Sequence, residues 1–259
     1  MQPAHAPAES DVELLRALEE ARRRNEELES ENADLRHFGH VVSHDLGEPL
    51  RTMSGFAALL EADLGPQLGE RSAQYLALIR SGAERMQALI DDVRAYTRAG
   101  QQELASAAVD LGSLLDEVVT SLGAGIAERH ALVEHGPLPT VRGDRSMLGV
   151  VLQNLVTNGI KFNGSSRPRV CVEAREAPGA VEVDVLDNGI GIPAEHRDRV
   201  FGLFTRLHTR DEYPGTGLGL AISRRVMERH GGHVTVADAA AGTCVRLTFP
   251  ASAVVRRTT

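Results

Sequence analysis

The first part of the chain repeats two kinds of position every seven residues. One position is taken by Leu14, Ala21, Leu28, Leu35 and Val42, and the other by Leu18, Asn25, Asn32, Gly39 and Leu46. This repeat predicts a parallel coiled coil over residues 11–36, because a buried asparagine meets its partner only when two helices lie in register. A single charged helix surrounded by water is the alternative. Residues 1–10 hold few large apolar groups and are expected to be disordered.

Apolar residues then recur at spacings of three and four along two further segments. The first series is Leu46, Leu50, Met53, Ala57, Leu60 and Leu64, and the second is Leu76, Ile79, Ala83, Met86, Ile90, Val93 and Thr97. This spacing predicts two helices, separated by glycine and proline at residues 65–69. One hairpin cannot bury both apolar stripes alone, so we expect two copies to form a dimeric four-helix bundle over residues 37–101.

After a linker expected at residues 102–109, the pattern changes to alternating strands and helices. The expected helices are 111–128, 144–162, 194–201 and 218–230, and the expected strands are 131–135, 169–174, 180–186, 233–238 and 243–249. This alternation predicts a second domain, of the α/β type, over residues 110–255. The whole chain is therefore expected to be an α+β protein, in which a helical part precedes a domain with a sheet.

Composition excludes some classes of function. The chain of 259 residues has 36 acidic and 28 basic residues, which argues against nucleic acid as the partner, because Lys and Arg drive binding to its phosphates. No run approaches the roughly 18 apolar residues of a membrane span. Residues 1–10 lack the apolar core of a signal peptide, so we expect a cytoplasmic protein. Cys171 and Cys244 lie in apolar strand-like runs without a C-x-x-C pair, which indicates buried thiols.

Three polar residues share one face of the helix expected at 144–162. Asn154, Asn158 and Lys161 stand at positions i, i+4 and i+7, which lie above one another on a helix. An amide oxygen can ligate a hydrated Mg²⁺, and an ammonium group can meet a phosphate chain. The face is therefore a candidate surface for a nucleotide, although the pattern alone fits an ordinary polar face at least as well.

Asp187 follows directly on the apolar strand expected at 180–186, and Gly189 and Gly191 come next. A residue at a strand end aims its carboxylate into the space above the sheet, and glycines let the backbone approach a flat ligand. Because a carboxylate only accepts hydrogen bonds, its expected partner is a donor such as the exocyclic amine of adenine. The same D-x-G-x-G pattern also forms an ordinary turn.

A glycine-rich segment opens the helix expected at 218–230. It reads Gly215-Thr216-Gly217-Leu218-Gly219. Glycine in a helix costs about 1 kcal/mol relative to alanine, so its use here indicates backbone N–H groups that cradle phosphates. A dinucleotide site of the Rossmann type is disfavoured, because the preceding residues 201–214 form a polar loop and not a strand. We expect that loop to be a lid whose arginines, Arg206 and Arg210, face the terminal phosphate.

Five motifs follow one another along the chain. They are H-x-x-S-H-D-L-x-E-P-L-R from His40, N-L-x-x-N-x-x-K-F from Asn154, D-N-G-I-G-I from Asp187, F-x-x-F-x-R-L-H from Phe201 and G-T-G-L-G-L from Gly215. Their order and spacing resemble the H, N, G1, F and G2 boxes of sensor histidine kinases of two-component systems, especially those attached to phytochromes. The resemblance implies a dimerising phosphotransfer hairpin and an ATP-binding domain of the Bergerat type, shared with gyrase, MutL and chaperone ATPases.

Applied to this chain, the resemblance implies that His44 is phosphorylated and that Asp45 orients or deprotonates it. It makes Asn158 the Mg²⁺ ligand, Lys161 a phosphate contact and Asp187 the residue that reads adenine. The implied ATP site consists of Asn154, Asn158, Lys161, Phe162, Asp187, Gly189, Gly191, Arg206, Gly215, Thr216, Gly217, Leu218 and Gly219. The seven-residue repeat agrees, since it places His44 on the outer side of the helical pair, within reach of another domain.

The implied reaction is autophosphorylation of His44 by ATP within a homodimer, followed by transfer to an aspartate on the receiver domain of a response regulator. Family members that also dephosphorylate their regulator usually carry Thr or Asn four residues after the histidine. This chain has Glu48 there, so phosphatase activity is not implied. Residues 1–36 are too short for a sensor domain, so we expect the input from a further N-terminal sensor domain, a fusion or a separate sensor protein.

Other functions use some of the same residues. A nucleotide-gated interaction module would bind ATP without transferring phosphate. It does not explain why every position needed for phosphoryl transfer carries a suitable residue. An ATPase or serine kinase of the same nucleotide fold does not explain the His44–Asp45 pair on a dimerising helix. Zinc bound by His37, His40 and His44 is disfavoured, because the neighbouring acid fits the H box better.

Overall fold

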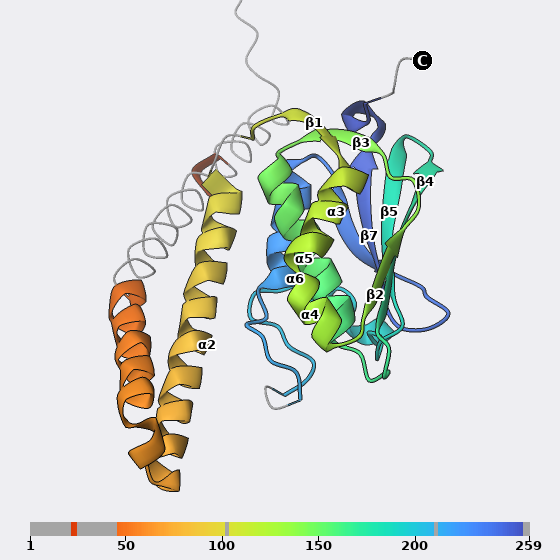
Figure 1. Ribbon diagram of the computed structural model, residues 1–259. Helices are drawn as coiled ribbons and strands as arrows, with labels where there is room; N and C mark the ends of the chain where they lie inside the picture. Colours follow the sequence, from red (N-terminus) through yellow and green to blue (C-terminus); the bar gives the residue numbers. More distant parts are fainter. Residues whose placement is uncertain (1–21, 25–45, 102–103, 210–211, 256–259) are drawn as a thin grey trace, which may run out of the picture.

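The computed structural model describes residues 22–24, 46–101, 104–209 and 212–255. In these ranges two antiparallel helices lie beside a domain with a mixed sheet (Figure 1). The coiled coil expected over residues 11–36 falls outside the description, except for residues 22–24, which are helical. His44 and Asp45 fall outside it as well.

The helical hairpin forms where the apolar spacing predicts it. Residues 46–64 are helical, the short 3-10 turn η1 (Gly65–Gln67) follows, and α2 (Glu70–Gln101) runs back beside the first helix (Figure 1). Leu50 packs with Ala83 and Ile90 of α2 in a small buried cluster. The hairpin therefore has a core of its own, but a small one.

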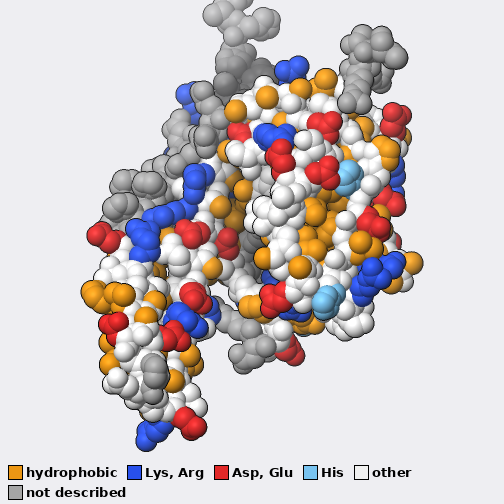
Figure 2. Space-filling view, viewed as in Figure 1, with side chains coloured by type: hydrophobic (Ala, Val, Ile, Leu, Met, Phe, Trp, Pro, Cys, Tyr) orange, Lys and Arg blue, Asp and Glu red, His pale blue; other side chains and the backbone are white. Residues whose placement is uncertain are grey.

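Most of the apolar stripe of the hairpin lies at the surface, where hydrophobic side chains are visible in Figure 2. The exposed large apolar residues of the hairpin are Leu46, Met53, Phe56, Leu59, Leu60, Leu64, Tyr75, Leu78, Ile79 and Met86. Extended apolar patches of this kind mark surfaces that pack against another chain. The expected pairing with a second copy stays a prediction, because the structure contains one chain.

The C-terminal domain is built on a five-stranded sheet. Its strands are β2 (Leu132–His135), β4 (Arg169–Ala177), β5 (Ala180–Asp187), β6 (His233–Ala237) and β7 (Cys244–Pro250). They lie in the order β2-β4-β5-β7-β6, with β2 parallel to β4 and the other neighbours antiparallel. Alternate residues turn one face of the sheet to the core, namely Val170, Val172, Val183, Val185, Val245, Leu247 and Phe249.

Helices cover that face of the sheet (Figure 1). They are α3 (Leu111–Ser121), α4 (Gly123–Glu128), α5 (Arg145–Lys161) and α6 (Gly219–Arg229). Leu148 and Leu152 of α5 and Ile222 of α6 are almost completely buried between the helices and the sheet. A single core therefore places the beginning of α6 and the end of α5 at the same edge of the domain as the end of β5.

A small second sheet, which the sequence pattern did not predict, accompanies the main one. β1 (Ala107–Asp110) pairs antiparallel with β3 (Thr140–Gly143). These strands have four residues each, too few for the alternation of apolar and polar positions to be recognised. The linker expected at residues 102–109 therefore ends earlier, because its last residues belong to β1.

Two expected helices are also interrupted. The helix expected at 111–128 is divided into α3 and α4 at Leu122, where Gly123 and Gly125 lower the preference for a continuous helix. The helix expected at 194–201 consists of two 3-10 turns, η2 (Ala194–His196) and η3 (Arg199–Phe201). Each turn has three residues, and Pro193 directly precedes the first.

The expectation of two buried thiols is correct for only one cysteine. Both cysteines are free, and Cys244 is buried whereas Cys171 is partly exposed. Strand β4 directs Val170 and Val172 to the core, so the residue between them faces the other side of the sheet. The apolar run around Cys171 did not reveal this, because one residue of shift exchanges the two faces.

Candidate functional site

A cavity of about 390 Å³ opens at this edge of the domain. Its walls come from α5, the ends of β5 and β7, the loop that precedes α6, and α2 of the hairpin. Cavities of a few hundred Å³ are typical of sites for small molecules and cofactors. The residues in these walls define the candidate site.

The first wall is the C-terminal half of α5. Asn154, Asn158 and Lys161 all line the cavity, as expected from their spacing on one helix face. The amide nitrogen of Asn154 donates to the carbonyl of Gly219 at 3.2 Å, so this side chain ties α5 to the beginning of α6. Asn158 and Lys161 lie further along the same wall, towards the end of α5.

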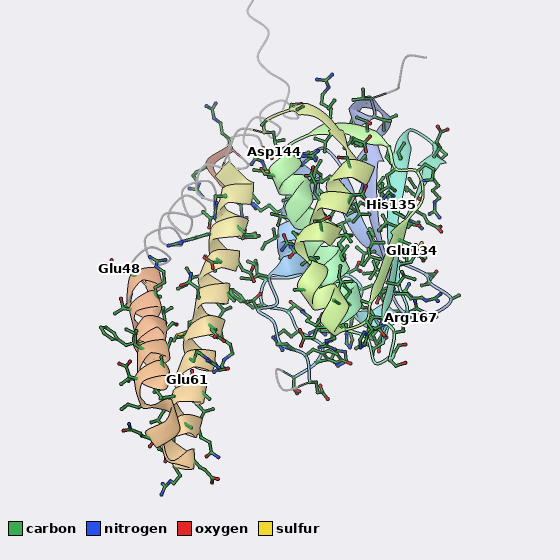
Figure 3. The ribbon with its side chains drawn as sticks, in the orientation of Figure 1. Glu48, Glu61, Glu134, His135, Asp144 and Arg167 are labelled. Atoms are coloured by element: carbon green, nitrogen blue, oxygen red, sulfur yellow. The ribbon has the colours of Figure 1, made fainter. Side chains whose placement is uncertain are left out.

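The position of this helix depends on its N-terminal cap. The Oδ1 atom of Asp144 accepts hydrogen bonds from the backbone N–H groups of Ser146 and Met147 at 3.0 and 3.1 Å. Figure 3 shows Asp144 near the small sheet, at the end of α5 remote from the cavity. The backbone N–H of Asp144 also donates to Nε2 of the buried His230, which lies at the end of α6. The two helices that frame the cavity are thus joined at their far ends.

Asp187 stands at the end of β5 and points into the cavity. Its Oδ1 atom accepts hydrogen bonds from the backbone N–H groups of Gly189 at 2.8 Å and Thr243 at 3.0 Å. Burial raises the pKa of Asp187, while these hydrogen bonds lower it again, and the net result is a raised pKa. A carboxylate held in this way has a defined direction and keeps lone pairs for a donor on a ligand.

Two glycines allow the backbone around Asp187 to close. A side chain at Gly189 would collide with the carbonyl oxygen of Phe162. A side chain at Gly242 would collide with the carbonyl oxygen of Asp187, and Gly242 also has a φ of +65°, which favours glycine. The sequence analysis included Gly189 but not Gly242, because no motif marks the turn before β7.

The glycine-rich loop forms the opposite wall. Gly217 adopts a φ of +79°, and a Cβ at this position would lie only 3.0 Å from backbone atoms of Phe204 and Thr205, so a side chain would be strained and crowded there. Gly215 lies within 3.0 Å of the ammonium nitrogen of Lys161, measured from the position a Cβ would take. The loop thus lies directly beside the lysine of the first wall. Leu218 takes part only through its backbone, since its side chain is 1% exposed and belongs to the core.

The lid is braced by Arg206. Its guanidinium group donates to the carbonyl oxygens of Gly215 and of Tyr213, the latter at 2.8 Å. Arg206 also lines the cavity, whereas the other expected lid arginine, Arg210, lies outside the described residues. In this structure Arg206 therefore shapes the lid, a role that the sequence analysis did not anticipate.

Aromatic contacts hold the lid against the end of α5. The ring of Phe162 lies 5.1 Å from that of Tyr213 and 6.4 Å from that of His208, between ring centroids. The ammonium nitrogen of Lys161 lies 4.2 Å from the centre of the Phe162 ring, a distance typical of a cation–π contact. His208 and Tyr213 were visible in the sequence only as parts of a polar loop, and their partner became evident from the fold.

The cavity has a positive side. Burial lowers the pKa of Lys161, the neighbouring Arg206 lowers it further, and the carboxylate of Asp92 acts in the opposite direction. Two cations that are close enough to affect each other attract a ligand with several negative charges. This side of the cavity therefore suits a phosphate chain, and the Asp187 side suits a group with a hydrogen-bond donor.

One residue of the cavity comes from the hairpin and was not expected. The carboxylate of Asp92, on α2, accepts a hydrogen bond of 2.5 Å from the hydroxyl of Thr216 in the glycine-rich loop. Burial raises the pKa of Asp92, although the bond from Thr216 and the charge of Lys161 lower it in part. No sequence signal distinguishes Asp92 from the other acids on α2, since its role depends on the packing of two separate parts of the chain.

The structure thus brings most of the predicted site residues together. Those that line the cavity are Asn154, Asn158, Lys161, Phe162, Asp187, Gly191, Arg206, Gly215, Thr216, Gly217 and Gly219. Gly189 and Leu218 shape the neighbouring backbone and core instead. His44 and Asp45 are the two predicted residues about which the described part of the chain gives no geometry.

Comparison with known families and proteins agrees with this geometry. The model of the His Kinase A (phospho-acceptor) domain matches residues 34–102, and that of the Histidine kinase-, DNA gyrase B-, and HSP90-like ATPase matches residues 143–253. Cyanobacterial phytochrome A of Nostoc sp. strain PCC 7120 is 39% identical over 223 residues, which are 86% of this chain and 29% of that protein. The chain belongs to the sensor histidine kinases of two-component systems.

Two further similarities show how much of each relative this chain covers. Phytochrome-like protein Cph1 of Synechocystis sp. strain PCC 6803 is 38% identical over 85% of this histidine kinase and 30% of its own length. The chain therefore spans less than a third of either phytochrome. The crystal structure of full-length ShkA in complex with AMPPNP superimposes with a TM-score of 0.64 and 28% identity, over 84% of this chain and 46% of that one. The predicted resemblance to sensor histidine kinases is confirmed.

Proposed function

We propose that this protein uses ATP to phosphorylate His44 and passes the phosphoryl group to an aspartate on the receiver domain of a response regulator. The observation that carries the proposal is the meeting of Asn158, Lys161, Asp187 and the glycine-rich loop around one cavity. Three sequence motifs that are far apart in the chain thus form one site that suits a nucleotide. The hairpin that carries the phospho-acceptor motif belongs to the same chain.

The two sides of the cavity suggest how ATP is held. The amine of adenine donates to the carboxylate of Asp187, and the adjacent glycines let the base approach the backbone. The phosphates lie against the glycine-rich loop and Lys161, where backbone N–H groups and an ammonium group meet their charge. Phe162 and Arg206 close this side, through the aromatic contacts and the lid.

Magnesium fits this site only together with the phosphates. Within the described ranges no group of three or more His, Cys, Asp and Glu side chains is arranged to hold a metal ion. Mg²⁺ commonly keeps several waters and takes one or two protein ligands beside substrate phosphates, so the amide oxygen of Asn158 is a sufficient protein ligand. Once bound, the ion neutralises phosphate charge, while Asn154 holds the glycine-rich loop in place through Gly219.

The transfer itself rests on the H-box pair. A histidine has an ordinary pKa near 6.5 and is mostly neutral at pH 7. Asp45 accepts the N–H of one ring nitrogen of His44, which directs the lone pair of the other nitrogen to the γ-phosphorus. A nitrogen–phosphorus bond forms as the bond between that phosphorus and the oxygen of ADP breaks, and Asp45 stabilises the charge that develops on the ring.

The partners follow from the same assignment. The exposed apolar stripe of the hairpin supports a homodimer, in which two hairpins bury the stripe in a four-helix bundle. We propose that an upstream sensor domain or sensor protein acts on the hairpin through residues 11–36. Among the described residues no helix is long and apolar enough to cross a bilayer, which is compatible with the proposed cytoplasmic location.

Glu48 does not provide the hydrogen-bond donor that Thr or Asn would offer for phosphatase activity at this position. The side chain is exposed on the first helix of the hairpin, as Figure 3 shows. An ionised carboxylate has no proton with which to hold an attacking water by donation. We therefore propose a kinase without strong phosphatase activity towards its regulator.

Incubation with ATP labelled at the γ-phosphate tests the proposal. We expect the protein to acquire label that is lost in acid and kept in alkali, and we expect His44→Gln to remove it. His40→Gln, which changes another histidine of the same motif, serves as the matched control and should keep the label. Unchanged labelling of His44→Gln would refute the assignment of the phospho-acceptor.

A further inference from the structure

Asp92 places a negative charge in the part of the cavity that is otherwise suited to phosphates. Its Oδ2 atom accepts the hydroxyl proton of Thr216 at 2.5 Å. The charge of Lys161 affects Asp92, and the charge of Asp92 affects Lys161, so the two groups are close. The carboxylate thus uses the same hydroxyl and the same ammonium group that the proposed function assigns to the triphosphate.

A carboxylate and a triphosphate are unfavourable neighbours in this space. Both are anionic acceptors, and half-buried like charges repel each other more strongly than charges in water. The Thr216 hydroxyl has one proton and can donate it to only one of them. Either Asp92 leaves the loop or the phosphates stay out.

The contact of Asp92 is part of a longer interface along one face of α2. Four residues further on, the ring of Tyr96 lies 5.2 Å from the guanidinium carbon of Arg225 on α6. Three residues beyond that, the carbonyl oxygen of Ala99 accepts a hydrogen bond of 3.0 Å from Arg229. Positions i, i+4 and i+7 share one helix face. This face of α2 therefore contacts the glycine-rich loop through Asp92 and α6 through Tyr96 and Ala99.

We propose that Asp92 occupies the place of the nucleotide phosphates, so that ATP binding and docking of the ATP-binding domain on α2 exclude each other. The inference rests on the proposed function, since it requires that this cavity binds ATP. The docked arrangement is then a resting state of the kinase. ATP displaces Asp92, weakens the interface at its cavity end and releases the domain to reach the phospho-acceptor.

This coupling has a consequence in both directions. If ATP weakens docking, then any change that weakens docking must strengthen ATP binding by the same factor. Loss of the Asp92 charge and loss of the distant Arg225–Tyr96 contact should therefore have the same sign of effect on ATP affinity. A purely local repulsion by Asp92 would leave the Arg225 position without effect.

The first test measures the affinity for AMPPNP by isothermal titration calorimetry on the whole chain. Asp92→Asn keeps the size of the side chain and removes its charge, so we expect the dissociation constant to fall at least about fivefold, the lower end of typical coupling between linked sites. Asp91→Asn is the matched control, because Asp91 is the neighbouring carboxylate but has a side chain that is 59% exposed. An equal affinity of Asp92→Asn and Asp91→Asn would overturn the inference.

The second pair of variants tests docking without a change in the cavity. Arg225→Ala removes the contact with Tyr96, and we expect it to tighten AMPPNP binding as well. Arg224→Ala removes the neighbouring arginine, which pairs with Glu228 on the surface of α6, and should leave the affinity unchanged. If Arg225→Ala and Arg224→Ala bind AMPPNP equally, docking and nucleotide binding are not coupled.

Amide hydrogen exchange follows the release directly. We expect AMPPNP to increase exchange in peptides that cover residues 92–100 of α2 in the wild-type protein, because the interface with α6 opens. Unchanged or slower exchange there would contradict release. If the wild-type chain does not bind AMPPNP at all, the proposed nucleotide site is wrong, whereas normal binding with identical variants refutes only the role of Asp92.

Discussion

Asp187 shows how a single side chain acquires a direction from the backbone around it. Two N–H groups, of Gly189 and Thr243, hold one carboxylate oxygen, and the glycines at 189 and 242 allow this close approach. The residue type alone states only that Asp187 accepts hydrogen bonds. The turn around Asp187 directs the carboxylate, so that it can accept a hydrogen bond from a ligand in the cavity.

Asp187→Asn should change this position from a hydrogen-bond acceptor for the ligand into a donor. In asparagine the oxygen would still accept from the two backbone N–H groups, and the amide would then present donors to the amine of adenine. We expect AMPPNP binding to weaken about 10-fold to 100-fold, which corresponds to the loss of a hydrogen bond to a charged group. Titration calorimetry measures this change.

A guanine nucleotide provides the decisive comparison for this variant. Guanine has an acceptor where adenine has the amine, so the affinity for GTP relative to ATP should rise in Asp187→Asn. Asp238→Asn makes the same chemical change at a carboxylate whose side chain is 94% exposed and should alter neither affinity. A wild-type affinity of Asp187→Asn for AMPPNP would show that Asp187 does not read the base.

At the scale of one element, α5 carries Asn154, Asn158 and Lys161 of the proposed site and is capped at its N-terminus by Asp144. Burial alone would raise the pKa of Asp144, but hydrogen bonds from the Ser146 hydroxyl and from backbone N–H groups outweigh it and lower the pKa below its ordinary value. The backbone donors belong to Met147, Ala105 and Ser146. The cap therefore joins α5 to the segment that leads out of the hairpin.

Asp144→Ala should reduce the free energy of unfolding by about 1 to 2 kcal/mol at pH 7, as loss of an N-cap does. Because the pKa is lower in the folded state, the contribution of the carboxylate is complete above the unfolded value and is lost as the pH falls through the folded one. The difference between wild type and Asp144→Ala should therefore shrink as the pH falls from 5 to 3. Urea unfolding at several pH values measures it.

Asp144→Asn is the control for this prediction. Asparagine caps helices as well as aspartate does but does not titrate, so its stability relative to Asp144→Ala should not change over the same pH range. If Asp144→Ala stays equally destabilised at pH 3, the charge of the carboxylate does not stabilise the cap.

At the scale of the whole molecule, the hairpin has two distinct surfaces. One face of α2 contacts the glycine-rich loop and α6. The exposed apolar stripe, which includes Phe56 and Ile79, remains available for a second copy. The proposed response to nucleotide and the proposed dimer thus use different surfaces of the same hairpin.

Ile79→Glu tests the dimer surface. A charge in an apolar interface without a partner costs several kcal/mol. We therefore expect the dissociation constant of the dimer to rise at least about 100-fold. AMPPNP binding should be retained, because Ile79 does not line the cavity. Sedimentation equilibrium measures the association, and Glu84→Lys, an exposed polar position of the same helix, should not affect it. Wild-type association of Ile79→Glu would exclude the stripe as the interface.

The sequence by itself determined the elements and the local chemistry of this protein. The spacing of apolar residues predicted the hairpin, the five strands of the main sheet and the long helix with Asn154, Asn158 and Lys161, because these patterns repeat with the period of the backbone. The glycines around Asp187 and Thr216 predicted close backbone approaches, because glycine has no side chain to prevent them. The short strands β1 and β3 escaped, since four residues carry too little of any period.

Only the tertiary structure decided which residues that are distant in sequence contact each other. Asp92 and Thr216 are 124 residues apart in sequence, and their contact depends on how the hairpin and the catalytic domain pack, which no local period records. The same holds for Arg206, whose hydrogen bonds to the carbonyl oxygens of Tyr213 and Gly215 are not evident from the sequence. Local patterns are set by backbone geometry, whereas contacts between distant segments are set by packing, so the proposed switch at Asp92 became visible only in the fold.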